Sequence, residues 1–485
     1  MKVARFYIEN FGCRATQADG AALERQFLDR GLERAQLARD AEIVVLNTCT
    51  VTAGADKDAR ASIRRLRRTN PECRILVTGC YAQRAPEELA ALPGVTWVVG
   101  NSHKHQAAQI ATASQSNAFI PIAQLSRGSG SSPEIIVGDI FAHTELMAAP
   151  VFEAANERTR PNLKIQDGCD NRCSFCVIPY VRGQSRSLPS DRVLAEVRTL
   201  VSAGYREVVI SGINLGRWGR DLDTSPPSSA IGSQSRKDHT LVNLIRAILT
   251  ETSLEKLRIS SVEPMDWQDD LIALVASSPR IAKHAHVPMQ SGSDAVLRRM
   301  HRKYRPLHYR EKISKIRQAM PDAALGADVM VGFPGETEQE FTETQRLVEE
   351  LPFTYLHVFT YSARPGTSAA QLRHQVPVAL ARERNAILRE IASSKKNSFM
   401  RSLVGREVEA ITLQTGDDEF TEALTHNYLK ARILGHVDAN QWVRILVENV
   451  DGEFLIGQTL SPALVAEAKP DSVALSSHHY NPVFL

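Results

Sequence analysis

Apolar residues in the first hundred positions fall into short runs that alternate with amphipathic stretches. Residues 3–8, 41–49 and 74–80 have the pattern of buried strands, and residues 19–32 and 56–68 have the pattern of helices. Strands that alternate with helices along a chain predict a parallel α/β sheet. The carboxyl ends of its strands meet at one edge, where such sheets bind their ligands.

The same alternation of strand and helix returns after residue 160. Strands are predicted at 162–166, 207–212, 257–262, 284–289, 323–333 and 355–361. About six βα units of this kind predict a partial, open barrel rather than a closed eight-stranded one. The sites of such barrels lie at the carboxyl ends of the strands. In this chain those ends carry Gly212, Glu263, Gln290, Ser291, Gly292 and Gly332.

The remaining segments lack these periods and divide the chain into domains. Residues 106–155 include a Ser- and Gly-rich stretch and are expected to form a linker. Beyond residue 401, short alternating runs between turn residues predict a small β-barrel. We therefore expect an amino-terminal α/β domain at 1–105, the partial barrel at 156–400, the small barrel at 401–468 and a disordered tail at 469–485.

Composition adds limits on the class of protein. A chain of 485 residues with 43% hydrophobic and 23% charged residues is expected to form several globular domains with sizeable cores. The formal net charge of +3 does not by itself predict nucleic-acid binding. Local basic clusters at residues 64–68, 298–305 and 395–401 leave RNA open as a partner. Without a signal peptide or a long apolar run, the expected location is the cytoplasm, away from membranes.

Three cysteines after the first strand of the partial barrel form a C-x-x-x-C-x-x-C motif. They are Cys169, Cys173 and Cys176. Cysteine thiolates hold iron–sulfur clusters, and three thiolates on a four-iron cubane leave one iron open for a small molecule. The alternatives are a zinc site, a disulfide cluster or packing cysteines. Zinc would usually need a fourth nearby ligand, and disulfides are not expected in a reducing compartment.

A second set of cysteines lies in the amino-terminal domain. Cys13, Cys49 and Cys80 each follow a predicted strand, so they should meet at one edge of the sheet. This placement predicts a second cluster, and the alternative is three independent packing cysteines. Cys73 has no such position and is interpreted as incidental.

The sequence around these cysteines resembles a known enzyme family. Strings 11–14, 47–52 and 78–83, together with the central motif, are similar to the methylthiotransferases of the radical S-adenosylmethionine superfamily. The resemblance implies a 4Fe–4S cluster on Cys169, Cys173 and Cys176 and an auxiliary 4Fe–4S cluster on Cys13, Cys49 and Cys80. It also implies that the carboxyl-terminal barrel is an RNA-binding TRAM domain. One departure is Thr16, which stands where the family usually has Asn.

The resemblance further implies what the strand ends bind. S-adenosylmethionine serves as radical source and methyl donor, and Gly212, Glu263, Gln290, Ser291, Gly292 and Gly332 are expected to contact it. Glycines permit close backbone approach, while Glu263 and Gln290 offer hydrogen bonds to its amino group and ribose. The alternative for each glycine is that it only turns the chain.

The expected function is that of a tRNA methylthiotransferase. Strings at 47–52, 165–169, 182–187 and 211–216 are most similar to the branch that modifies carbon 2 of N6-threonylcarbamoyladenosine beside the anticodon. The partners would be the tRNA anticodon loop, an electron donor and a sulfur source. The alternatives are an enzyme for isopentenyl-adenosine tRNA or for a ribosomal-protein aspartate, and a non-catalytic iron–sulfur RNA-binding protein.

Overall fold

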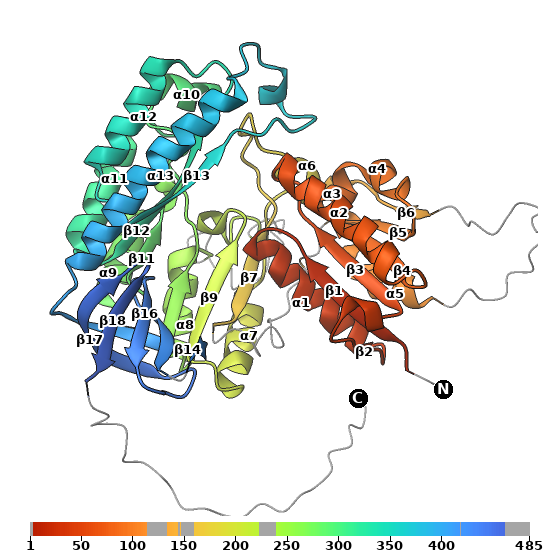
Figure 1. Ribbon diagram of the computed structural model, residues 1–485, viewed down its shortest axis with the longest axis horizontal. Coiled ribbons are helices and arrows are strands. Elements are labelled where there is room, and N and C mark those ends of the chain that lie inside the picture. Colours follow the sequence, from red (N-terminus) through yellow and green to blue (C-terminus); the bar gives the residue numbers. More distant parts are fainter. Residues whose placement is uncertain are drawn as a thin grey trace, which may run out of the picture.

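The computed structural model describes residues 3–113, 133–143, 146, 160–222, 239–417 and 419–460. They form an amino-terminal sheet, a central partial barrel and a small carboxyl-terminal barrel, which occupy separate parts of the molecule (Figure 1). The tail expected at 469–485 lies outside these residues.

The amino-terminal region is a six-stranded sheet in the order β2-β1-β3-β4-β5-β6. Every pair in it is parallel, as predicted from the alternation of strands and helices. The strands are β1 (Arg5–Asn10), β2 (Glu33–Arg34), β3 (Ile43–Thr48), β4 (Arg74–Gly79), β5 (Val95–Gly100) and β6 (Glu134–Ile136).

Helices cover both faces of this sheet. Leu23 and Phe27 of α1 (Arg14–Leu28) pack against Phe6 on one face, together with α5 (Ala107–Thr112). Residues of α2 (Ala53–Thr69), α3 (Cys80–Arg84) and α4 (Pro86–Ala90) pack on the other face. Both α5 and β6 fall in the segment expected to be a linker, because six-residue and three-residue elements are too short to show a period.

The central region contains six parallel strands in two sheets. The first has the order β10-β9-β7-β8 and the second the order β11-β12-β13. The parallel strands are β7 (Asn162–Asp167), β9 (Glu207–Gly212), β10 (Lys256–Ile259), β11 (His284–His286), β12 (Ala324–Val331) and β13 (Tyr355–Thr360). Short β8 (Arg186–Ser187) pairs antiparallel with β7. This arrangement confirms the partial barrel.

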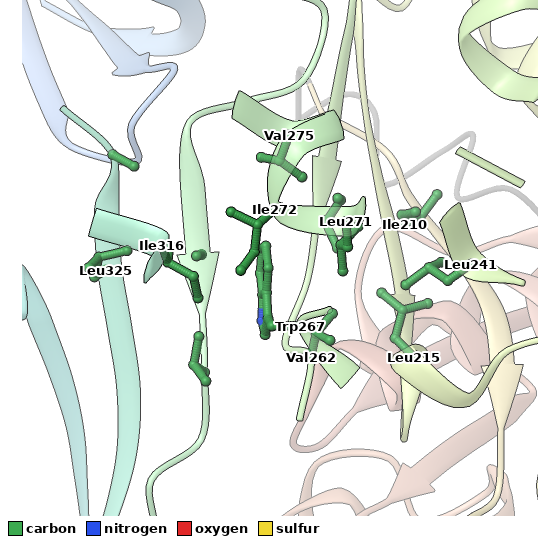
Figure 2. Packing of buried hydrophobic residues seen from close by; sticks show 14 of the residues in the cluster. Ile210, Leu215, Leu241, Val262, Trp267, Leu271, Ile272, Val275, Ile316 and Leu325 are labelled. Carbon is green, nitrogen blue, oxygen red and sulfur yellow. The ribbon is translucent and has the colours of Figure 1, made fainter. Parts of the chain in front are cut away.

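Helices lie outside the central strands and bury the main apolar core. They include α7 (Ser190–Ser202), α8 (Leu241–Glu251), α9 (Asp269–Ser277), α10 (Asp294–Arg299), α11 (Pro306–Ala319), α12 (Glu338–Glu350) and α13 (Val378–Arg401). Figure 2 shows Trp267 beside Ile272 of α9, with Ile316 of α11 nearby. The Trp267 side chain is fully buried. Burial of one large apolar side chain stabilises the fold by about 1.5–3 kcal/mol.

The carboxyl-terminal region is a closed barrel in the order β14-β15-β16-β18-β17. Its strands are β14 (Glu407–Gly416), β15 (Phe420–Thr425), β16 (Lys430–Leu434), β17 (Trp442–Asp451) and β18 (Phe454–Thr459). The sequence predicted this barrel from alternating runs at 407–413, 428–433, 442–447 and 454–459. It missed β15, where Glu422 and Ala423 weaken the strand pattern.

The small barrel is attached to the amino-terminal ends of the central strands, opposite the ends that carry the cysteine loop. Lys256, the first residue of β10, contacts Glu409 at 2.9 Å. Arg258 donates to the backbone oxygen of His426 at 3.2 Å. In the part of the chain that the structure covers, no helix has the length and apolarity needed to cross a bilayer.

Candidate active site

The central cysteine loop begins where β7 ends, as the sequence predicted. Gly168 has φ +73, and a Cβ there would lie 1.9 Å from the backbone oxygen of Gln184. This position therefore requires glycine. The amide of Cys169 then donates to the oxygen of Gly183 at 3.1 Å, which fixes the start of the loop.

Polar side chains from other strands contact the loop thiols. Asn214 donates its Nδ2 to Cys169 Sγ at 3.6 Å, and Arg302 donates to Cys173 Sγ at 3.3 Å. Burial raises the pKa of Cys176 to about 12. The free Cys176 thiol is therefore protonated at neutral pH, and binding of a metal would release its proton. Donors such as Arg302 stabilise the negative charge of a bound cluster.

A pocket lies directly beside the central thiols. Its walls include Cys173, Arg217, Glu263, Met265 and Arg302. Glu263 and Arg302 form an ion pair. Burial raises the pKa of Glu263, although the neighbouring Arg302 opposes that shift. The pocket therefore has a carboxylate and two guanidinium groups in its walls, beside the cysteine loop.

Glu263 is the member of the expected cofactor-binding set that lines this pocket. Gln290 has φ 64, and its backbone N–H donates to the backbone oxygen of Asp328 at 2.8 Å. Gly212 lies against Gln166, whose Cβ would be 2.9 Å from an added Cβ.

The other members of that set pack against outer helices. The hydroxyl of Ser291 is 3.1 Å from that of Thr344 in α12, and a Cβ on Gly292 would meet Thr344 Cα at 2.6 Å. A Cβ on Gly332 would meet Ala381 Cβ in α13 at 2.6 Å. These contacts give each residue a packing role whatever else it binds.

The second set of cysteines lies at the carboxyl edge of the amino-terminal sheet. Cys13 is the N-cap of α1, Cys49 follows β3, and Cys80 opens α3. Burial, together with the Cys80 and Cys13 thiols, raises the pKa of Cys49 to about 11. All three cysteines therefore lie at the carboxyl edge of the sheet, which is where their positions after predicted strands placed them. Cys73 instead lies in the apolar core beneath the sheet.

Close packing and polar contacts hold this second set in place. Gly12 has φ +100, and an added Cβ would be 2.8 Å from Cys49 Sγ. Thr16 Oγ1 lies 3.6 Å from Cys13 Sγ, and Asn101 donates to Cys80 Sγ at 3.5 Å. Thr16 thus keeps a polar contact to the cysteine despite the departure from the family's Asn.

The donor sets distinguish between kinds of metal site. Among the described residues, no three His, Cys, Asp or Glu side chains are arranged to hold a metal ion. In a cubane cluster each thiolate binds a different iron, whereas in a zinc site all ligands bind the same ion. Two sets of three thiols, each with nearby hydrogen-bond donors, fit cubane clusters better than single ions.

A short helix connects the two cysteine sets. Helix α6 (Ile178–Arg182) starts two residues after Cys176. Cys80 packs against Val177 and Val181, in a small apolar cluster with Ile178 beside it. Helix α6 therefore adjoins both sets, although they belong to different sheets.

Beside α6 lies a buried charge network that sequence reasoning missed. Asp19 contacts Lys104 and Arg182 at 2.9 Å each and also pairs with Lys164. Asp167 accepts from Lys164 at 2.8 Å and from Arg182 at 2.9 Å. Burial raises the pKa of Asp19, but the three cations outweigh burial and hold it below its usual range. The available signal was a charged residue, Asp19, on the buried face of α1.

Family models match two parts of the chain. Residues 5–100 match the family described as "Uncharacterized protein family UPF0004", and residues 163–348 match the radical SAM superfamily. These ranges cover β1 to β5 of the amino-terminal sheet and most of the partial barrel.

Curated relatives cover nearly the whole chain. It is 34% identical to the threonylcarbamoyladenosine tRNA methylthiotransferase MtaB of Aquifex aeolicus, over 92% of this chain and 100% of the relative. It is 35% identical to MtaB of Bacillus subtilis, over 90% of this chain and 92% of the relative. It is also 32% identical to a tRNA-2-methylthio-N(6)-dimethylallyladenosine synthase of Novosphingobium aromaticivorans, over 85% and 87% of the two chains.

Solved structures share the fold at low identity. The radical S-adenosylmethionine methyltransferase TsrM of Kitasatospora setae superposes with a TM-score of 0.52 at 15% identity, covering 76% of this chain and 77% of that chain.

Proposed function

Because the chain belongs to the methylthiotransferase family of radical S-adenosylmethionine enzymes, we propose that it adds a methylthio group to carbon 2 of N6-threonylcarbamoyladenosine in tRNA. The observation that carries the reaction class is the pair of cysteine sets that both adjoin α6. Support for the substrate comes from the MtaB relatives of Aquifex aeolicus and Bacillus subtilis, which align over 100% and 92% of their own length.

In this proposal Cys169, Cys173 and Cys176 hold a 4Fe–4S cluster that binds S-adenosylmethionine. A cluster held there would supply one-electron reduction of S-adenosylmethionine, with the electron coming from the external donor. Glu263 lies beside Cys173 and serves the amino group of S-adenosylmethionine, while Arg302 orients Glu263 and donates to Cys173 Sγ at 3.3 Å. Gly212, Gln290, Ser291, Gly292 and Gly332 shape the strand ends around that cofactor.

Cys13, Cys49 and Cys80 hold the second 4Fe–4S cluster, which serves sulfur insertion. Helix α6 keeps the two sites adjacent, because it follows Cys176 in the chain and packs on Cys80. A second S-adenosylmethionine supplies the methyl group. The sulfur source and the electron donor come from outside the chain.

The domain roles follow the same division. Residues 1–105 carry the sulfur-inserting site, 156–400 generate the radical, and the barrel at 401–468 acts as a TRAM-like RNA-binding domain. An anticodon loop suits this arrangement because its bases leave their stack at low cost. The barrel binds phosphates of the same tRNA, so binding should weaken as salt rises.

The test gives reconstituted enzyme two tRNAs that differ in the threonylcarbamoyl group. Nucleoside mass spectrometry should detect the methylthio product on the modified tRNA alone. Equal products on both, or activity only on isopentenyl-adenosine tRNA or a ribosomal protein, would overturn the substrate and leave the reaction class standing. A non-catalytic RNA-binding protein would release no 5′-deoxyadenosine.

A further inference from the structure

The inner face of the partial barrel is polar, unlike the inner face of an ordinary barrel. Closed (βα) barrels fill their interior with branched apolar side chains. Here the outward-facing residues of β13, Leu356 and Val358, join the apolar core, while Tyr355, His357 and Phe359 face inward. The barrel therefore keeps polar groups where packing alone would favour aliphatic ones.

Three inward side chains from neighbouring strands lie together. Asp328 of β12 is paired in register with His357 of β13, so both lie on the same face. The His286 ring of β11 is 5.5 Å from the His357 ring, and its Nε2 is 3.4 Å from an Asp328 oxygen. These residues form a carboxylate and two imidazoles on one surface.

The amino-terminal domain adds a positive charge to this surface. Arg14 donates to the hydroxyl of Tyr428 at 2.9 Å, and the tilted rings of Tyr428 and Tyr355 have their centroids 5.8 Å apart. Burial, the nearby His286 and Arg14 lower the pKa of His357, while Asp328 opposes them. The Tyr355 ring is in turn 5.3 Å from the His357 ring and 5.9 Å from the His286 ring, so Tyr428 and Tyr355 connect Arg14 to the two histidines, and all three regions of the molecule meet here. We name Arg14, His286, Asp328 and His357 the lumen cluster.

Part of the lumen cluster lacks hydrogen-bond partners. The His286 side chain is buried, with 7% of the residue exposed, and its Nε2 makes no hydrogen bond within the described part of the chain. Arg14 carries five N–H donors, and Tyr428 takes one of them. Asp328 is half-buried and His357 is exposed, so both can be reached by a ligand. The cluster thus offers donors and acceptors to a polar group that enters the barrel.

The lumen cluster adjoins the proposed radical site. His286 Nδ1 bonds to the hydroxyl of Ser261, two residues before Glu263 in the chain. Glu263 pairs with Arg302, which donates to Cys173 at 3.3 Å. A substituent that extends from a base at the cysteine loop into the barrel would therefore meet His286 first and Arg14, which contacts Tyr428 at the other end of the strands, last.

We propose that the lumen cluster binds the threonylcarbamoyl substituent of the target adenine, an inference that rests on the proposed function. Arg14 suits the carboxylate, because a guanidinium binds carboxylates with two parallel donors. Asp328 accepts from the hydroxyl or from the urea N–H, and the imidazoles donate or accept. An isopentenyl group offers no hydrogen bond to any of these groups. A site built to hydrogen-bond its substrate rejects analogues that lack the bonding groups.

The first experiment measures binding of anticodon stem-loop RNAs to the reconstituted full chain. The two RNAs are identical except for the threonylcarbamoyl group. The wild type should bind the modified RNA at least about tenfold more tightly, which corresponds to about 1.4 kcal/mol. His357→Leu and Asp328→Asn should lose most of that ratio. Their affinity for the unmodified RNA should remain within about twofold, which also shows that they are folded.

Matched controls replace the same residue types on exposed outer helices. His308→Leu in α11 and Asp191→Asn in α7 should keep the wild-type ratio. A second arm uses an RNA whose threonyl carboxylate is converted to an amide. The wild type should bind it less tightly than the acid, whereas Arg14→Gln should bind acid and amide equally.

The outcomes separate this inference from the proposed function. A wild type without preference, together with absent methylthiolation, would overturn both. The lumen cluster alone would be overturned if the wild type prefers the modified RNA and the His357→Leu and Asp328→Asn variants keep that preference. In that case Arg14→Gln would also still distinguish the acid from the amide. A preference lost in the lumen variants and kept in the controls supports it.

Discussion

At the scale of single residues, buried charge holds the two cysteine-bearing regions together. Asp19 contacts Lys104 from its own region and Lys164 and Arg182 from the partial barrel. All four side chains are almost fully buried. A buried charge that loses its partner is costly, so the network stabilises one relative position of the two regions.

We expect Asp19→Asn to lower the free energy of unfolding by about 3–5 kcal/mol, because it leaves buried cations uncompensated. Denaturant unfolding followed by tryptophan fluorescence measures the change. The control is Asp29→Asn at the exposed end of α1, which should change stability by less than about 0.5 kcal/mol. Equal stability of the two variants would contradict this account of the network.

We also expect Cys49→Ala to separate the two proposed clusters in function. The thiol of Cys49 lies with those of Cys80 and Cys13, away from the loop that follows β7. The variant should still release 5′-deoxyadenosine and should form no methylthio nucleoside, both measured by mass spectrometry. Cys73→Ala is the matched control, since Cys73 lies in the apolar core, and it should retain both products. Loss of radical generation in Cys49→Ala, with its central cluster intact, would refute the division of roles.

At the scale of elements, the position of the carboxyl-terminal barrel changes how its role can be tested. Its β15–β16 turn places Tyr428 against His284 at 4.6 Å, at the amino-terminal ends of the central strands. Removing the barrel would therefore expose the interior of the partial barrel as well as remove RNA contacts. Single charge changes on the barrel surface test RNA binding more cleanly than truncation.

Lys430 and Arg432 on β16 form a basic and aromatic surface with Phe454, at 5.4 Å and 4.2 Å from its ring. We expect Arg432→Gln to weaken tRNA binding uniformly and to reduce the slope of log affinity against log salt by about 0.7–0.9, the value of one phosphate contact. Filter binding at several salt concentrations measures that slope. Arg198→Gln on α7 is the control, because Arg198 is an exposed arginine of the partial barrel paired with Glu251. An unchanged slope in Arg432→Gln would exclude this surface as a phosphate site.

At the scale of the whole molecule, two cysteine sets in two regions predict two clusters. Anaerobic reconstitution should load about eight irons per chain, four in each cubane. Replacing Cys169, Cys173 and Cys176 with Ala should halve that number and abolish cleavage of S-adenosylmethionine. Replacing Cys13, Cys49 and Cys80 should halve the iron content and preserve cleavage. A full iron complement in the second triple variant would show that these cysteines bind no cluster.

The sequence by itself determined the features that depend on neighbouring residues. Alternating strands and helices predicted the parallel sheet and the partial barrel, because burial on one or both faces imposes a period on the chain. The C-x-x-x-C-x-x-C spacing predicted the central site, because its three thiols share one loop. A general rule about strand ends predicted that Cys13, Cys49 and Cys80 lie at the same edge of the sheet. Short elements such as β6 and α5 were missed, since they show no period.

Only the tertiary structure decided which distant residues meet. Asp19 and Arg182 are far apart in sequence, and their contact depends on how α1 packs beside β7 and α6. The same holds for Arg14 and Tyr428, which come from the two ends of the chain and meet at the partial barrel. His286, Asp328 and His357 look like ordinary strand residues in sequence. Their common inner face follows from strand register, which a single sequence does not specify.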